Sequence, residues 1–71
     1  NSYLIKKRIN ASIENMDRGI IKGNTSIACD NALLAVSLIE KNIKSLRRIE
    51  PYYDWIEIKS LLKMISNKNC D

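Results

Sequence analysis

With 71 residues, the chain can form one small domain that buries only about 60% of the surface exposed by the unfolded chain. Apolar residues make up 45% and charged residues 28%, which is normal for a globular domain. Twelve basic against eight acidic residues give a net charge of +4, which permits an acidic partner without requiring one. The longest apolar run, Ala32–Val36, is far shorter than the roughly 18 residues of a membrane span, so none is expected.

The first predicted helix covers residues 3–21. Its apolar side chains recur at intervals of three and four residues, which is the spacing of a one-sided helical stripe. Glu14 precedes Arg18 by four residues, the favourable order for an exposed ion pair. Gly23 is suited to cap the C-terminal end of this helix. The stripe consists of Ile5, Ile9, Ile13, Met16 and Ile20.

A second predicted helix covers residues 25–48. It starts at Asn24-Thr25-Ser26, a cluster of residues that are favoured as N-terminal caps. A heptad seam runs along its whole length. A second apolar set makes this helix apolar most of the way round, so it should be central and covered on more than one side. The seam is Cys29, Ala32, Val36, Ile39, Ile43 and Leu46, and the second set is Ile27, Leu34 and Leu38.

A third helix is predicted over residues 51–65, because Pro51 can end one element and occupy the first turn of the next. Its stripe is Trp55, Ile58, Leu62 and Ile65, and residues 66–71 read as a polar tail. Short loops favour antiparallel neighbours. The sequence therefore predicts a single all-α domain over residues 1–71, an antiparallel three-helix bundle that dimerisation or a partner could complete.

Residues suited to catalysis are scarce. The chain has no histidine, which removes imidazole acid–base catalysis and imidazole metal ligands. Two cysteines cannot by themselves supply the four ligands of a structural zinc site. Asp54 and Glu57 are spaced like acids of a first helical turn, where they complement the helix dipole. We therefore expect a protein that is not an enzyme and that uses no metal and no cofactor.

Cys29 and Cys70 admit two interpretations. They can form a disulfide that ties the tail across the bundle and stabilises it by roughly 3–4 kcal/mol. Alternatively, Cys29 is a small buried apolar residue and Cys70 an incidental exposed thiol. A bridge favours an exported protein, periplasmic or secreted, over a cytoplasmic one, because most cytosols keep thiols reduced. The start at Asn1 fits either a removed leader or a fragment.

The richest candidate for a binding surface lies where the second and third predicted helices meet. Tyr52 and Tyr53 are adjacent in the sequence, so at least one of them should be exposed. Trp55 falls on the apolar stripe that is expected to face the core. Tyrosine, tryptophan and arginine dominate the energetic hot spots of protein interfaces. The alternative is that the arginines only complement a helix C-terminus. The predicted partner-binding residues are Arg47, Arg48, Tyr52, Tyr53 and Asp54.

Two functions remain in competition. The favoured one is a non-catalytic protein–protein interaction module, such as an inhibitor, an immunity-type protein or an assembly accessory protein. A homodimer through the second predicted helix is a related arrangement. The alternative is a small basic nucleic-acid-associated transcription modulator, suggested by the net charge and by basic clusters at residues 6–8 and 41–48. The aromatic residues gather in one place instead of interleaving with these clusters, which disfavours nucleic acid.

Overall fold

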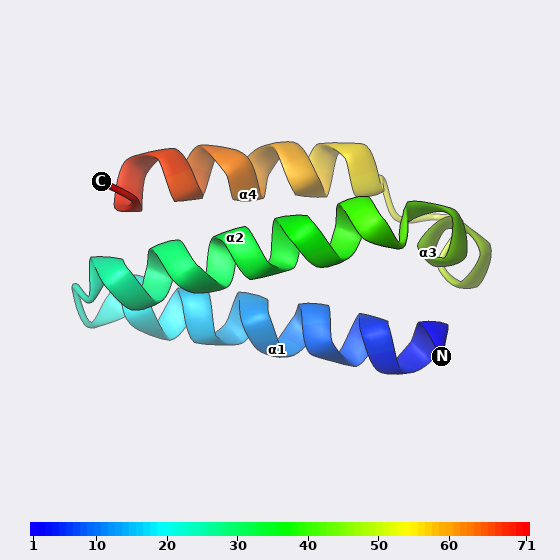
Figure 1. The fold of residues 1–71 in the computed structure, drawn as a ribbon, viewed down its shortest axis with the longest axis horizontal. Coiled ribbons are helices and arrows are strands. Elements are labelled where there is room, and N and C mark those ends of the chain that lie inside the picture. The colour runs from blue at the N-terminus through cyan, green and yellow to red at the C-terminus, as the bar shows by residue number, and fades with distance from the viewer.

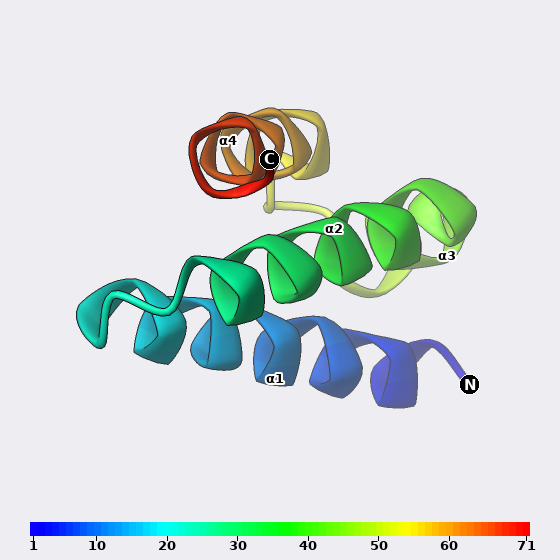
Figure 2. The same ribbon diagram turned by 60° about the vertical axis from the view of Figure 1, so that its left-hand side comes forward.

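The computed structural model describes residues 1–71 and contains four helices and no strands (Figure 1). Helix α2 lies in the middle, with α1 against one side and α4 against another, and the second view shows the same order (Figure 2). No Cα atom of α1 lies within 8 Å of a Cα atom of α4, so α2 separates these two helices and packs against both. The all-helical prediction is confirmed, but the predicted three-helix bundle is not matched. The bounds are α1 Ser2–Ile21, α2 Thr25–Lys41, α3 Ile43–Ile49 and α4 Trp55–Asn69.

The prediction of one continuous second helix over residues 25–48 is wrong, because two helices occupy this range. Helix α2 ends at Lys41, and the short helix α3 begins at Ile43. Between them, the Asn42 side-chain Nδ2 donates a hydrogen bond to the Leu38 carbonyl at 2.8 Å. Asn42 leaves the helical conformation, with φ −126° and ψ 20°, and its backbone N–H donates to Ile39 instead of Leu38. The side chain thus bonds the Leu38 carbonyl that the backbone ladder no longer reaches. Leu46 remains fully buried beyond it, so the seam still reaches the core.

The predicted third helix, residues 51–65, is displaced along the chain. Pro51 lies in the turn, and α4 begins only at Trp55. Asp54 is its N-terminal cap, since its Oδ1 accepts from the Glu57 backbone N–H at 3.0 Å. The predicted polar tail, residues 66–71, is largely helical, and Ser66 is buried.

One hydrophobic cluster forms the core, and the three predicted stripes supply most of it. Trp55 is only 3% exposed, as its place on the stripe predicts. The second apolar set of α2 is covered in part: Leu38 is buried, but Ile27 and Leu34 are each 44% exposed. The buried cluster is Ile9, Met16, Ala32, Ala35, Val36, Leu38, Ile39, Leu46, Trp55 and Leu62.

The turn between α1 and α2 is built by two glycines and a capping residue. Gly23 has a φ of 71°, which suits the predicted end of α1. The Oδ1 atom of Asn24 accepts from the Ile27 N–H at 3.1 Å and begins α2 as predicted. Gly19 lies inside α1, and a Cβ atom there would approach the Ala28 backbone nitrogen to 2.9 Å. The two helices therefore meet backbone to backbone at this end.

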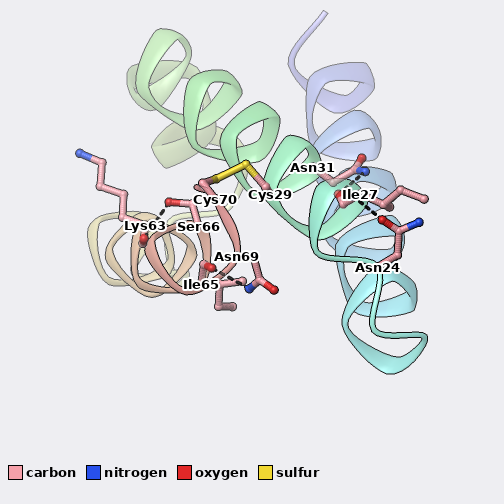
Figure 3. Close-up of a disulfide and its surroundings, with 9 residues drawn as sticks. All are labelled: Asn24, Ile27, Cys29, Asn31, Lys63, Ile65, Ser66, Asn69 and Cys70. Atoms are coloured by element: carbon pink, nitrogen blue, oxygen red, sulfur yellow. Dashed lines mark hydrogen bonds between the residues drawn. A yellow bond between two sulfur atoms is a disulfide. The ribbon is translucent and has the colours of Figure 1, made fainter.

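A disulfide joins Cys29 to Cys70, with their Cα atoms 4.9 Å apart (Figure 3). It links the N-terminal half of α2 to the C-terminal end of α4. No free cysteine remains. No helix of the chain has both the length and the apolar character needed to cross a membrane.

Candidate partner-binding surface

The five residues predicted to bind a partner lie together where α3 gives way to α4. Arg47 and Arg48 occupy the last turn of α3, and residues 52–54 follow in the connecting turn. All five are exposed. This region, residues 47–54, is called the α3–α4 corner, and it lies at the same end of the molecule as the N-terminus of α1 (Figure 1).

Tyr53 is the anchored tyrosine of the corner. Its ring lies against Trp55, with ring centroids 5.3 Å apart and planes inclined by 42°. The Lys6 ammonium group lies 5.5 Å from the centroid of the Tyr53 ring. Aromatic pairs and cation–π contacts of this kind each contribute about 0.5–1 kcal/mol at exposed sites. Tyr53 is therefore held between the core and α1, and it remains 47% exposed.

Glu50 holds the turn from the other side. Its side chain forms an ion pair with Lys6 of α1, which is the only ion pair in the chain. Its carbonyl oxygen accepts from the Trp55 indole Nε1 and from the Tyr53 backbone N–H, each at 3.3 Å. The hydrogen bond to Glu50 raises the pKa of Lys6 above its ordinary value of 10.5. The turn is thus fixed to both α1 and α4.

Sequence reasoning missed the roles of Lys6 and Glu50. They are separated by 44 positions, and no local pattern links them. Lys6 reads in the sequence only as part of a basic cluster. Their pairing depends on the tertiary arrangement of α1 and α3.

Asp54 has a structural role at the start of α4, close to the helix-terminal role that the sequence analysis gave it beside partner binding. Its carboxylate caps α4, as described above, and Glu50 is paired with Lys6. Both carboxylates of the corner are therefore engaged within the chain. Arg47 and Arg48 have no carboxylate oxygen within 4 Å. The unpaired formal charge of the corner is positive.

Tyr52 differs from its neighbours because nothing in the chain covers it. It is 98% exposed, although the residues on either side are in an ordered turn. Its ring presents a large apolar surface with a hydroxyl group at the tip. Such a side chain buries much area on binding at a low cost in conformational entropy.

A hollow of about 220 Å³ adjoins Arg47 at the junction of α2, α3 and α4. Ile56, at its edge, is 49% exposed. Sequence reasoning missed Ile56. Its position outside the apolar stripe of α4 could have indicated that this isoleucine is exposed. The hollow gives the corner a recess with both apolar and charged walls. Its walls are Ile39, Glu40, Ile43, Arg47, Ile56 and Lys59.

The corner presents exposed aromatic and basic side chains as contact surface. No group of three or more histidine, cysteine, aspartate or glutamate side chains in the chain is placed to hold a metal ion. The exposed Ile27 and Leu34, seven residues apart on one face of α2, form a smaller apolar strip away from the corner. No protein-family model, no curated protein and no solved structure matches this chain.

Proposed function

We propose that this protein is a non-catalytic interaction module that holds or occludes a protein partner through the α3–α4 corner. The observation that carries the proposal is the contrast between Tyr52, 98% exposed, and the anchored residues around it. Lys6, Glu50 and Tyr53 are tied to one another and to the core. An inhibitor, an immunity-type protein and an assembly accessory protein all act through such a surface.

Anchoring of the turn favours binding for an energetic reason. Immobilising a flexible side chain or loop in an interface costs about 0.5–1.5 kcal/mol for each rotamer-rich side chain. In the corner, the contacts of Tyr53 and Glu50 have already ordered the turn. Tyr52 then has only its own rotamer to fix when a partner covers it.

The charges of the corner favour an acidic partner. Glu50 and Asp54 are engaged internally, whereas Arg47 and Arg48 are free to bind carboxylates. Arginine binds carboxylate oxygens through two parallel hydrogen bonds. The net charge of +4 would also accelerate encounter with an acidic surface. The proposed partner surface therefore carries acidic side chains around a recess for Tyr52.

Site-specific photo-crosslinking tests this proposal. A benzophenone amino acid replaces Tyr52 in one variant and Met64 in a control, which is 55% exposed on α4. Irradiation in cells of the native source should give one major protein adduct from position 52, mapped by mass spectrometry to an acidic surface. The variant with the benzophenone at position 64 should give little of this adduct. Equal yields from both positions, or no protein adduct from position 52, would reject the proposal.

A further inference from the structure

A second surface with distinct chemistry lies at the opposite end of the molecule, beside the α1–α2 turn. It is a cleft of about 480 Å³. That volume falls in the range of roughly 300–1,000 Å³ found for small-molecule sites, although most such sites are apolar. Here only Ile27 is apolar, and no carboxylate lines the cleft. Its walls are Asn15, Arg18, Gly19, Lys22, Asn24, Ile27 and Asn31.

Hydrogen bonds within the cleft use up acceptors and leave donors free. The Oδ1 atom of Asn15 accepts from the Arg18 guanidinium, and the Oδ1 atom of Asn24 accepts from the Ile27 N–H. A carboxamide has two N–H donors besides its oxygen. The amide groups of Asn15 and Asn24 therefore keep their donors for a ligand.

Of the remaining polar groups, Arg18 and Lys22 add donors, whereas Asn31 uses one. The Nδ2 atom of Asn31 donates to the Ile27 carbonyl at 2.9 Å, so Asn31 keeps one N–H donor and its carboxamide oxygen. Figure 3 shows Asn24 and Asn31 both hydrogen-bonded to Ile27. Arg18 has five N–H donors and Lys22 three, and neither has a carboxylate partner. The expected pair between Glu14 and Arg18 does not form, since Arg18 bonds Asn15 instead.

The two walls of the cleft are held in place. Gly19 lets α1 approach the Ala28 backbone, as described above. Cys29 lies between Ile27 and Asn31 in sequence, and its disulfide ties this part of α2 to α4 (Figure 3). The backbone that carries the cleft residues is therefore already ordered before a ligand binds, which lowers the entropic cost of binding.

We propose that this cleft binds a small phosphorylated molecule, whose phosphate oxygens accept hydrogen bonds from Arg18, Lys22 and the free amide groups of Asn15 and Asn24. A phosphate monoester carries a charge of about −1.5 to −2 at neutral pH and three terminal oxygens. It therefore matches two cations and several donors better than a single carboxylate does. Ile27 can contact the carbon skeleton of the ligand.

An NMR titration of the disulfide-bonded chain tests the site, with ribose 5-phosphate as the probe and ribose as its uncharged match. Ribose 5-phosphate should shift the backbone amides of Gly19 and of residues 24–31 saturably, and ribose should not. The proposal is overturned if the shifts do not saturate, if ribose gives the same shifts, or if they spread evenly over the basic surface.

Three variants separate a built site from diffuse attraction. Arg18→Gln should weaken binding at least about tenfold, because it removes a charge and the bidentate donor pair. Asn24→Asp preserves the α2 cap, since aspartate is as good an N-cap as asparagine, but it places a negative charge in the cleft. It should weaken binding at least about tenfold while the melting temperature stays equal or rises.

Lys63→Gln is the matched control, because Lys63 is exposed on α4 and does not line the cleft. It should change the affinity less than about twofold, as expected for a distant and screened charge. Equal weakening by Lys63→Gln and Arg18→Gln would mean diffuse electrostatic attraction and would overturn the proposal. The proposal would also be overturned if the Asn24→Asp variant bound ribose 5-phosphate with the affinity of the wild type.

Discussion

Lys6 and Glu50, separated by 44 positions in the sequence, form the only ion pair of the chain and fasten α1 to the turn that precedes α4. Helices α1 and α4 share no close backbone contact, whereas α1 does contact α3, so the ion pair extends the α1–α3 contact to the turn before α4. Lys6 also lies over the Tyr53 ring. One side chain of α1 therefore positions the proposed partner-binding turn.

The pair predicts a pH dependence of stability at the alkaline end. The pKa of Lys6 is raised in the folded chain by the hydrogen bond to Glu50. The folded state then binds the proton more tightly than the unfolded state, so this contribution is complete below about pH 10.5 and is lost as the pH rises through the raised value. We expect the melting temperature of the wild type to exceed that of Lys6→Gln at about pH 9, and the gap to narrow above about pH 10.5. A constant gap over this range would contradict the role given to Lys6.

Gly19→Ala should destabilise the protein by about 1–3 kcal/mol, because the new methyl group would meet the Ala28 backbone nitrogen at 2.9 Å. The direction is informative, since alanine is favoured over glycine by about 1 kcal/mol within a helix. Urea unfolding measures the change. Asn10→Ala, at an exposed position of α1, is the control and should be neutral or slightly stabilising. A more stable Gly19→Ala variant would show that the two helices do not meet closely there.

Opening the disulfide should cost up to about 4 kcal/mol, the loop-entropy value for a separation of 41 residues. The effect should appear first in α4, which contacts α2 and α3 but not α1. Hydrogen exchange of the reduced wild type should therefore show lower protection of the α4 amides than of the α1 amides. The Cys29→Ala, Cys70→Ala double variant should give the same pattern without a reductant. Uniform loss of protection along the chain would disagree with this arrangement.

The nucleic-acid alternative makes an opposing prediction. A regulator that contacts phosphates directly would bind duplex DNA with an affinity that falls steeply as salt rises. The proposed interaction module should show no binding to labelled duplex tighter than the non-specific range of roughly 1–100 μM, measured by fluorescence anisotropy. Submicromolar binding that is lost in the Arg47→Ala, Arg48→Ala double variant would support the alternative and assign the corner to nucleic acid.

The helical stripes could be predicted because three- and four-residue spacing reflects burial directly. Trp55 and Leu46 lie in the core for that reason. The Gly23–Asn24 turn was also predictable, since a positive φ and an asparagine cap are local requirements. The grouping of the corner residues followed from their closeness in the chain.

Other features depend on local hydrogen bonding or on tertiary contacts, which the spacing of apolar residues does not show. The apolar spacing continues from Ile39 to Ile43 on either side of Asn42, so it gives no sign that the backbone leaves the helical conformation there. Residues 66–71 are polar in composition, but the buried Ser66 and the bonded Cys70 hold them. The Lys6–Glu50 pair has no sequence signal at all.

The most direct test of the proposed binding role uses the partner protein that photo-crosslinking identifies. Its affinity is measured for the Tyr52→Ala, Arg48→Ala double variant and compared with its affinity for the wild type. Both residues are exposed, so the melting temperature should stay close to that of the wild type. We predict at least about 30-fold weaker binding, the effect of losing one strong interface hot spot of about 2 kcal/mol. The Met64→Ala, Lys68→Ala double variant, altered at exposed positions of α4, should bind like the wild type. Wild-type affinity in the Tyr52→Ala, Arg48→Ala variant would contradict the proposal and place the interface elsewhere.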